Sequence, residues 1–509
     1  MHNPTDGGKR LQYALLASVF VVAACGLAYE LIAGALASYL LGDSVTQFST
    51  VIGAYLFAMG VGSWLSKFVT RDLVGAFVKI ELAVGLVGGF AAAALFVAFA
   101  ANAGPFRILL YLAVFAVGVL VGLEIPLVMR ILKRDVAFNE LVARVLSFDY
   151  LGALAVSILF PLLLAPHLGL VRTGFLFGLL NALVALWALT LFREQLARRS
   201  GLRVAGWLAV VLLAGGFVAA GRITTLAEGW IYADDIIHAE TTPYQRIIVT
   251  RWRDDIRLFL NQNLQFSSKD EYRYHEALVH PGLATLPQAR RVLVLGGGDG
   301  FAVREILKYP QIESVTLVDL DPAMTRLFSS ASLLRQLNGD ALNSPKVQVI
   351  NADAARWLED HAEVFDFIVA DFPDPSNYSV GKLYSAPFYR LLARHLAPHG
   401  LTVIQSTSPF YARESFWTVV ATLEDTGLKT MPYHALVPSF GEWGYILAGR
   451  ESYQPPETYA VELRFLTPQT TTAMFEFPAD MARVEAEPNR LNDQRLVRIF
   501  EAEWRHVVR

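Results

Sequence analysis

Long apolar runs dominate the first 220 residues of this chain, and they limit its possible folds more than any other feature. Nearly every long stretch between positions 11 and 220 is apolar, whereas the charge density beyond position 222 is ordinary. Only 17% of the 509 residues are charged, against about 25% in soluble proteins. A helix of roughly 20 apolar residues can cross a bilayer because its backbone groups bond within the helix. The chain therefore divides near position 222 into a membrane part and a second part.

Seven of the apolar runs are long enough to cross a membrane. They cover residues 13–41, 46–69, 76–100, 107–129, 142–164, 168–191 and 203–220. The first run follows two basic residues, as a signal peptide does, but it is about twice as long as a signal-peptide core and no small-residue cleavage site follows promptly. We predict an α-helical transmembrane bundle over 1–222, held in the lipid bilayer of the cell (inner) membrane as a multi-pass protein.

Basic residues alternate between the loops of this bundle. They gather before the first span and beside the second, fourth and sixth loops: Lys9, Arg10, Lys67, Arg71, Lys79, Arg130, Lys133, Arg134, Arg144, Arg193, Arg198, Arg199 and Arg203. The positive-inside rule places the N-terminus and these loops in the cytoplasm. Seven spans then put residue 222 onward outside, unless one run is re-entrant or the first run is broken near Gly26 or Gly34.

Ionisable residues interrupt the apolar runs, and they are functional candidates because burying a charge in a bilayer is expensive. Glu81 and Glu124 lie near predicted span ends beside basic residues, so we expect them to pair with these bases or to reach the membrane surface. Glu30 lies in the middle of the first run, where it could bind a cation. The single cysteine, Cys25, excludes an intrachain disulfide and a cysteine-based zinc cluster. We expect it to be a small packed residue.

Beyond position 230 the sequence changes to short alternating runs. Residues 244–250 and 256–260 predict strands of a small β-domain over 223–285, and a helix follows at 269–280 and ends at Pro281. Further strands, with helices between them, are predicted at 291–295, 315–319, 347–350, 365–370, 401–405 and 443–448. This alternation predicts a doubly wound parallel α/β sheet over 286–450. Residues 451–509 remain as a C-terminal extension.

Acidic residues recur where the predicted strands end. They are Asp299, Asp319, Asp353, Asp371 and Asp374. Ligands of open α/β sheets bind at the carboxyl ends of the strands, so five acids at matching positions predict a binding site. The net charge of −3 and the lack of a basic run with interleaved aromatics argue against nucleic acid as a partner.

A glycine-rich turn follows the first strand of this sheet, with glycines at 296, 297, 298 and 300. The dinucleotide fingerprint would need its third glycine at Phe301, which argues against NAD. The turn also lacks the Gly-Lys-Ser/Thr ending of an NTPase loop. With Asp319 at the end of the next strand, it looks like an S-adenosylmethionine-binding sheet, in which this acid holds the ribose.

Several motifs occur together, in a fixed order, over about 235–450. They are Tyr244-Gln245, Gln265 before Asp270-Glu271, Tyr274-His275-Glu276, Gly296 to Gly300, Val318-Asp319-Leu320-Asp321, Asp353, Asp371-x-x-Asp374-Pro375 before Leu383-Tyr384, Gln405 to Pro409, and Gly441-x-Trp443-Gly444. In these motifs the chain resembles the spermidine synthases, which are polyamine aminopropyltransferases. Its N-terminal spans are similar to those of membrane-fused members of that family.

The resemblance implies an S-adenosylmethionine-methyltransferase-like (Rossmann-like) fold and a reaction. The aminopropyl group of decarboxylated S-adenosylmethionine would pass to a diamine such as putrescine, giving spermidine and methylthioadenosine, with no metal. The residues implied to bind this donor are Gln245, Gly296, Gly298, Gly300, Asp319, Asp353 and Ala354. Those implied to bind the amine are Tyr274, His275, Asp299 and Asp374. Asp371 would accept a proton.

Elementary chemistry agrees with these implied roles. The donor is a sulfonium cation and putrescine is a dication, so an acidic site with few bases attracts both. The attacking amine must be neutral, yet alkyl ammoniums are protonated near pH 7. A carboxylate such as Asp371 must therefore take a proton.

Some residues depart from the family pattern, and two other functions remain open. Phe372-Pro373 replaces small hydroxyl residues and Ser376-Asn377-Tyr378 replaces Gly-Pro, so the amine is less defined than the donor.

One alternative is a methyltransferase that uses intact S-adenosylmethionine, although the carboxylate of that cofactor would face Asp299 unfavourably. The other is a polyamine transporter or sensor whose soluble domain only binds. We expect a cytoplasmic catalytic domain from its substrates, and homo-oligomerisation stays open.

Overall fold

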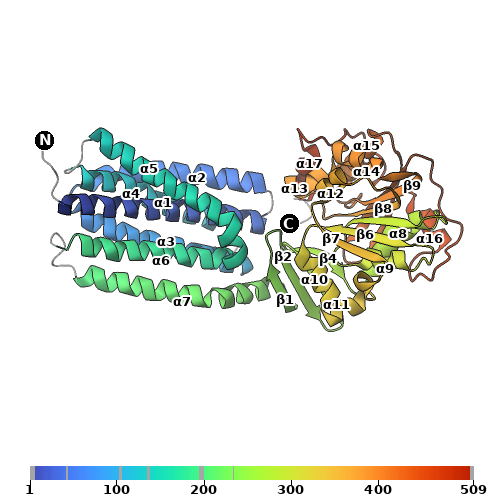
Figure 1. The fold of residues 1–509 in the computed structure, drawn as a ribbon, viewed down its shortest axis with the longest axis horizontal. Coiled ribbons are helices and arrows are strands. Elements are labelled where there is room, and N and C mark those ends of the chain that lie inside the picture. Colours follow the sequence, from blue (N-terminus) through green and yellow to red (C-terminus); the bar gives the residue numbers. More distant parts are fainter. Residues whose placement is uncertain are drawn as a thin grey trace. The chain divides into compact units, whose positions relative to one another are not determined.

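The computed structural model describes residues 6–41, 44–101, 106–133, 138–193, 200–232 and 234–504. The chain forms two compact units, Met1–Asp235 and Ile236–Arg509. The first unit is a bundle of long helices, and the second contains two β-sheets covered by shorter helices (Figure 1).

The helices of the first unit pack side by side. They are α1 (Asp6–Leu41), α2 (Ser44–Leu65), η1 (Ser66–Phe68), α3 (Leu73–Ala100), α4 (Phe106–Leu132), α5 (Phe138–Leu159), the π-helical η2 (Phe160–Leu164), α6 (Ala165–Leu191) and α7 (Ser200–Ile231). Large apolar side chains also cover the outside of the bundle, where Phe57 is 67% and Val218 is 80% exposed. A surface of this kind is suited to lipid rather than water.

Six helical segments of the described residues are long and apolar enough to span a membrane: Tyr13–Leu41, Val45–Phe68, Leu73–Ala100, Phe106–Leu132, Asn139–Leu191 and Ser200–Ile231. This number differs from the predicted seven because the predicted spans 142–164 and 168–191 fall within one segment of 53 residues. As a straight helix that segment would be about 80 Å long, against about 30 Å for a bilayer core. It is not straight. Gly169 breaks it with φ 74° and ψ 168°, and Figure 1 shows α5 and α6 running in opposite directions.

Glu81 and Glu124 are buried inside this bundle, at 0% and 1% exposure. Apart from each other's carboxyl groups, both oxygens of Glu81 and Oε1 of Glu124 have no hydrogen-bond partner within the described part of the chain. The nearby Arg130 instead donates to the carbonyl oxygen of Ser66 at 2.9 Å. The prediction that the two acids pair with neighbouring bases or reach the membrane surface is therefore wrong.

The second unit begins with a four-stranded sheet in the order β1-β2-β3-β4. Its strands are β1 (Asp235–Thr241), β2 (Arg246–Trp252), β3 (Asp255–Leu260) and β4 (Asn263–Ser267). The predicted strands 244–250 and 256–260 correspond to β2 and β3. Asn261 and Gln262, with φ 49° and 71°, make the tight turn into β4.

The helix α8 (Glu271–Leu283) continues through Pro281, where the sequence predicted its end. A proline at this position lacks the N–H that would bond to the carbonyl oxygen four residues earlier. That oxygen, on Ala277, instead accepts a hydrogen bond from the Tyr433 hydroxyl at 2.8 Å. The distant tyrosine therefore satisfies the carbonyl group that the proline leaves without an intrahelical donor.

The larger sheet has seven strands in the order β10-β11-β9-β8-β5-β6-β7. They are β5 (Arg291–Gly296), β6 (Ser314–Asp319), β7 (Val347–Asn351), β8 (Phe365–Asp371), β9 (Leu396–Gln405), β10 (Lys429–Val437) and β11 (Gly441–Gly449). The five strands from β9 to β7 are parallel, whereas β11 is antiparallel to both β9 and β10. The doubly wound, Rossmann-like class is confirmed, but the prediction of a wholly parallel sheet is wrong. The missed strand β10 contains Pro432, which an edge strand tolerates.

Helices cover both faces of this sheet, as double winding requires (Figure 1). They are α9 (Phe301–Leu307), α10 (Pro322–Ser330), α11 (Ser332–Leu337), η3 (Ala341–Asn343), α12 (Ala354–Asp360), α13 (Tyr378–Gly381), η4 (Lys382–Tyr384), α14 (Ala386–Arg394) and α15 (Arg413–Glu424). Val292 and Val294 belong to one buried core, and Leu293 and Leu295 belong to the other. Alternate residues of a strand point to opposite faces, so each apolar strand contributes to both cores.

The C-terminal extension contains α16 (Pro468–Met474) and α17 (Arg495–Trp504). It packs against both cores, with Met474 in one and Leu496 in the other. The buried carboxylate of Glu276 also accepts backbone N–H groups from residues 464, 465 and 466 at 2.8, 2.8 and 3.1 Å. The extension is therefore an integral part of the second unit.

Candidate active site

The glycine turn lies between β5 and α9, at the carboxyl edge of the sheet. Gly296, Gly297 and Gly300 have φ of 80°, 63° and 79°, a region that favours glycine. A methyl group at Gly298 would lie 2.7 Å from the carboxyl oxygen of Asp319. The Gly298 N–H donates to that same carboxylate at 3.1 Å. The turn thus holds Asp319 tightly, and a side chain at Gly298 would displace that carboxylate.

The parallel register brings the predicted acids to this edge. Asp319 ends β6 and Asp371 ends β8, on either side of β5, and Asp371 lies opposite Gly296 in the β5–β8 ladder. The prediction that these two acids follow the ends of parallel strands is confirmed. The order of the strands makes them neighbours of the glycine turn.

Asp319 belongs to the part of the site that the family resemblance assigns to the donor, and Asp321 lies beside it. Asp319 Oδ1 accepts the N–H of Asp321 at 2.9 Å, and burial is the main reason that the pKa of Asp319 rises to about 6. Asp321 accepts hydrogen bonds from Gln245 Nε2 at 2.9 Å and from Thr242 Oγ1 at 2.8 Å. Gln245, predicted within a strand, precedes β2 by one residue and is joined through Asp321 to the strand end that carries Asp319.

Asp353 occupies the start of α12, directly before the buried Ala354. Its Oδ1 accepts the N–H groups of residues 355 and 356 at 3.0 and 3.2 Å, and its Oδ2 accepts a hydrogen bond from Lys382 Nζ at 2.6 Å. Burial acts to raise the pKa of Asp353, but the Lys382 ammonium and the backbone donors outweigh it and lower the pKa. Asp353 is therefore ionised and fixed in orientation.

Asp371 lies at the centre of the acidic set. Its Oδ1 accepts a hydrogen bond from the Tyr274 hydroxyl at 2.7 Å. Burial raises the pKa of Asp371 to about 6, and the negative charge of Asp299 adds to that rise, while His275 and Tyr274 oppose it. A carboxylate whose pKa is close to neutral is suited to accept a proton in the reaction.

His275 lies on α8 and connects Asp371 to a further set of charges. Its Nδ1 donates to the carbonyl oxygen of Glu271 at 2.8 Å and contacts the Glu271 carboxylate at 3.0 Å. Glu271 in turn accepts two hydrogen bonds from Arg304, at 3.0 and 2.8 Å. Burial acts to lower the pKa of His275, but Glu271, Asp299 and Asp371 raise it overall. The imidazolium form is thus favoured, and it is a donor to the acids rather than a base.

Asp299 lies inside the glycine turn. Its Oδ1 accepts the N–H of Phe301 at 3.0 Å, and its carbonyl oxygen accepts Asn338 Nδ2 at 2.8 Å. Burial is the largest cause of its raised pKa, while His275 opposes the rise. Asp299 therefore adds a second carboxyl group near Asp371.

Asp374 is separated from Asp371 by Phe372-Pro373, where the sequence departs from the family pattern. Gln405 Nε2 and Thr407 Oγ1 donate to its two oxygens, each at 3.4 Å. Burial raises the pKa of Asp374 to about 7, and these donors oppose the rise. A cation bound beside it would stabilise the ionised form.

The surroundings of Asp374 contain residues to which the sequence analysis gave no role. Tyr384 donates to the carbonyl oxygen of Pro373 at 3.1 Å, and Trp443 Nε1 donates to Gln405 Oε1 at 3.1 Å. Tyr384, Gln405 and Trp443 belong to the sequence motifs described above, and those motifs could have indicated that they lie at the site. Trp504 of α17 has no local motif, yet its Nε1 donates to Thr407 Oγ1 at 3.4 Å.

Thr407 is also strained, with φ 33° in a region that threonine rarely adopts. β11 anchors this segment, since the Gly444 N–H donates to the Thr407 carbonyl oxygen at 2.7 Å and the Ser406 N–H donates to the Gly444 carbonyl oxygen at 2.9 Å. Strain of this kind costs free energy and persists only where the surroundings enforce it. Here it orients a hydroxyl group between Asp374 and the C-terminal helix.

The arrangement gathers carboxyl groups and one histidine around the end of β8, with no lysine or arginine hydrogen-bonded to Asp371 or Asp374 among the described residues. Within the described ranges no group of three or more His, Cys, Asp and Glu residues is placed to hold a metal ion. The site can therefore bind an organic cation and take a proton from it.

Comparison with known proteins gives a consistent result. Residues 271–457 match the family described as the spermine/spermidine synthase domain. Polyamine aminopropyltransferase 1 of Ralstonia nicotianae is 61% identical over 99% of this chain and 97% of its own length. Polyamine aminopropyltransferase of Leptospira interrogans is 52% identical over 98% of this chain and its entire length. The solved spermidine synthase of Thermotoga maritima aligns with 48% of this chain and 85% of its own, at 24% identity and a TM-score of 0.45.

Proposed function

This chain belongs to the polyamine aminopropyltransferase family, and from that premise we propose how its own carboxyl groups carry out the transfer. The enzyme moves the aminopropyl group of decarboxylated S-adenosylmethionine to an amine, and methylthioadenosine leaves. We propose a diamine such as putrescine as the acceptor. Neither a methyltransferase nor a transporter or sensor finds support in the relatives.

The donor is held by the residues at the ends of β6 and β7. Asp319 accepts the ribose hydroxyls, and Asp353, fixed by Lys382 and the start of α12, binds the adenine side together with Ala354. The bare backbone of Gly296, Gly298 and Gly300 lets the nucleoside approach. Gln245 faces the sulfonium side from the edge of the small sheet.

The amine is held on the other side of β5. Asp299 and Asp374 attract its positive charge, Tyr274 fixes the position of Asp371 from α8, and the charge of His275 favours the ionised form of Asp371. Gln405 and Thr407 orient Asp374. The amine is thereby directed at the propyl carbon of the donor in line with the carbon–sulfur bond.

Asp371 makes the bound ammonium reactive by taking one proton from it. The neutral nitrogen then attacks the propyl carbon, the carbon–sulfur bond breaks, and its electrons stay on sulfur as neutral methylthioadenosine. The observation that carries this role is the pKa of about 6, raised by burial, in a carboxyl group already fixed by Tyr274. His275 is less suited as a base because its own pKa is raised.

We propose further that the apolar helices hold the enzyme in the cell membrane and that the catalytic unit faces the cytoplasm. The substrates support this side, whereas the pattern of basic residues with seven crossings supports the outer side. A reporter fused after Arg509 tests this sidedness. A reporter that works only in the cytoplasm should be active, and one that works only outside the membrane should be inactive. The reverse result contradicts the proposal.

The reaction is tested with purified full-length protein. Decarboxylated or intact S-adenosylmethionine is supplied with putrescine, cadaverine or spermidine, and methylthioadenosine is measured. We expect release only with the decarboxylated donor and fastest with a diamine. Turnover of the intact cofactor alone, or binding without any release, would overturn the proposal.

A further inference from the structure

The membrane unit contains a set of buried polar side chains that the transfer reaction does not use. Glu81 of α3 and Glu124 of α4 lie within interaction range of each other and are 0% and 1% exposed. Apart from each other's carboxyl groups, both oxygens of Glu81 and one of Glu124 have no hydrogen donor within the described ranges. Two carboxyl groups in such a place need a positive charge or a proton, because a bare buried anion is prohibitively expensive.

Asn181 of α6 adds an independent sign that something binds here. It is fully buried, and neither its amide oxygen nor its amide nitrogen has a partner among the residues that the structure describes. Its Cβ lies 3.2 Å from the position that a Cβ on Gly85 would occupy, one helical turn after Glu81. A buried amide with both ends unsatisfied is rare in a folded protein.

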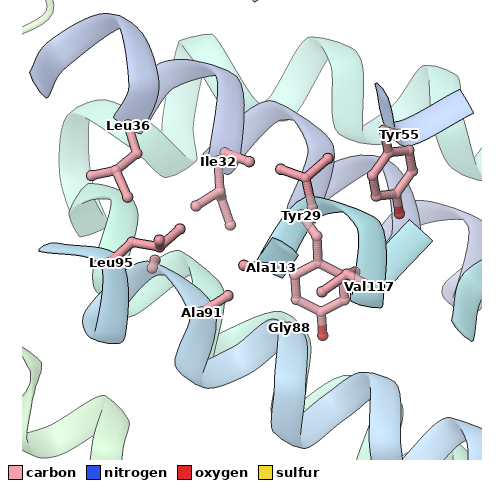
Figure 2. Close-up of a pocket in the computed structure, with 12 residues that line it drawn as sticks. Tyr29, Ile32, Leu36, Tyr55, Gly88, Ala91, Leu95, Ala113 and Val117 are labelled. Atoms are coloured by element: carbon pink, nitrogen blue, oxygen red, sulfur yellow. The ribbon is translucent and has the colours of Figure 1, made fainter. Parts of the chain in front are cut away.

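Tyr29 of α1 joins these groups to a cavity. Its ring packs against Gly88 of α3, where a methyl group would lie 2.6 Å from the ring. Its hydroxyl also lacks a hydrogen-bond partner in the described part of the chain, and it lies close enough to Glu124 and Glu81 for their charges to act on it. In Figure 2 the hydroxyl points away from the end of the cavity formed by Leu36 and Leu95. Tyr29 therefore forms the boundary between the cavity and the acids.

The cavity itself is apolar apart from Tyr29 and Tyr55 (Figure 2). Gly88 in its wall is seven residues from Glu81 on α3, and Val117 is seven residues from Glu124 on α4. Seven residues make about two helical turns, so each pair lies on one helix face about 10 Å apart. The apolar cavity and the two acids, Glu81 and Glu124, therefore lie about two turns apart along the same faces of α3 and α4.

We propose that Glu81, Glu124, Asn181 and Tyr29 form an intramembrane binding site for the ammonium group of an aliphatic amine. An ammonium group has three donors and no acceptor, which matches a cluster of acceptor oxygens. Without amine, the two carboxyl groups hold a proton in its place, so each ammonium that binds releases a proton from the pair. The described residues show no cluster suited to a metal ion, and the aliphatic walls favour an organic cation.

The test uses full-length protein in nanodiscs with radiolabelled spermidine. We expect two classes of site, one of which is lost in the double variant Glu81→Gln/Glu124→Gln while methylthioadenosine release stays within about twofold. The matched control is Glu140→Gln, which removes an exposed carboxylate of α5 that pairs with Arg144. It should keep both classes. One class in the unaltered protein, or two in the double variant, would overturn the proposal.

A second measurement observes the carboxyl pair of the unaltered protein directly. Infrared difference spectra on adding spermidine should lose the C=O band of a protonated carboxyl group, and Asn181→Leu should prevent that loss. An unchanged band means that the pair holds only a proton, which contradicts the proposal. The spectra are recorded at about pH 9, where Asp371 and Asp374, with pKa values of about 6 and about 7, are already ionised; a failure of the transfer mechanism would then appear in methylthioadenosine release and not in this band.

Discussion

Replacing Asp371 by asparagine tests the proposed proton acceptor with little change in shape. The asparagine side chain keeps an oxygen that can accept the Tyr274 hydroxyl, as Asp371 Oδ1 does at 2.7 Å. It cannot take up a proton. The glycine turn is held by the backbone of Asp371 and not by its side chain, since the Gly297 N–H donates to the Asp371 carbonyl oxygen. Folding and donor binding should therefore survive the substitution.

The expected loss of turnover follows from the role of a general base, which contributes about 10²- to 10⁴-fold. The pKa of Asp371 is about 6 in the ligand-free enzyme, so roughly nine-tenths of it is ionised at pH 7. As the pH falls below that pKa the base becomes protonated, and kcat should drop about tenfold per pH unit. Bound cations lower the pKa of a carboxyl group, so the midpoint at saturating substrate should lie at or below about 6.

The assay is methylthioadenosine release at saturating donor and amine between pH 5 and 9. Asp371→Asn should be slower by at least about 10²-fold at pH 7 and should lose the acidic limb. Its affinity for methylthioadenosine should match that of the exposed-site control Asp360→Asn. Turnover within tenfold of the unaltered enzyme, or an acidic limb that remains in place, would refute the role of Asp371.

Three further substitutions have distinct expected results. Asp374→Asn should raise the KM for the amine about 10- to 100-fold, the equivalent of one charged hydrogen bond, with the donor KM unchanged. The pKa of Asp374 in the folded protein is raised to about 7, so the stability of the ligand-free protein falls as the pH rises from about 4 to about 7. At about pH 8 the Asp374→Asn variant should therefore melt at a higher temperature than the unaltered protein. Gly298→Ala places a methyl group 2.7 Å from Asp319, so calorimetry should show donor affinity reduced by about tenfold or more, a cost of about 1–3 kcal/mol. Trp504→Ala removes the donor to Thr407 and should raise the amine KM about threefold to tenfold at unchanged kcat, whereas an unchanged KM would show that α17 is only structural.

Much of the catalytic unit follows from local pattern. The strands that end in Asp319 and Asp371 are short apolar runs, and the alternation of strand and helix predicts that they are parallel. Parallel strands place their carboxyl ends at one edge. The position of these two acids could therefore be predicted without knowing the order of the strands.

Other features depend on partners far away in the sequence, which a local pattern cannot contain. The helix α8 passes through Pro281 only because the Tyr433 hydroxyl bonds to Ala277. Trp504 reaches Thr407 only because the extension folds back over the sheet. In the membrane unit, Glu81 and Glu124 are brought together by the packing of two helices. The basic residues close to them in the sequence led to the wrong prediction that the acids pair with these bases or reach the membrane surface.

The central claim is that Asp371 faces the nitrogen that attacks the donor. An experimental structure of the full-length protein with methylthioadenosine and putrescine measures this directly. The account predicts one amine nitrogen about 2.7–2.9 Å from a carboxyl oxygen of Asp371, as in a charged hydrogen bond, and on the side of the sulfur that the propyl group would occupy. A diamine bound through Asp374 alone, with Asp371 turned toward the adenosine, would contradict it.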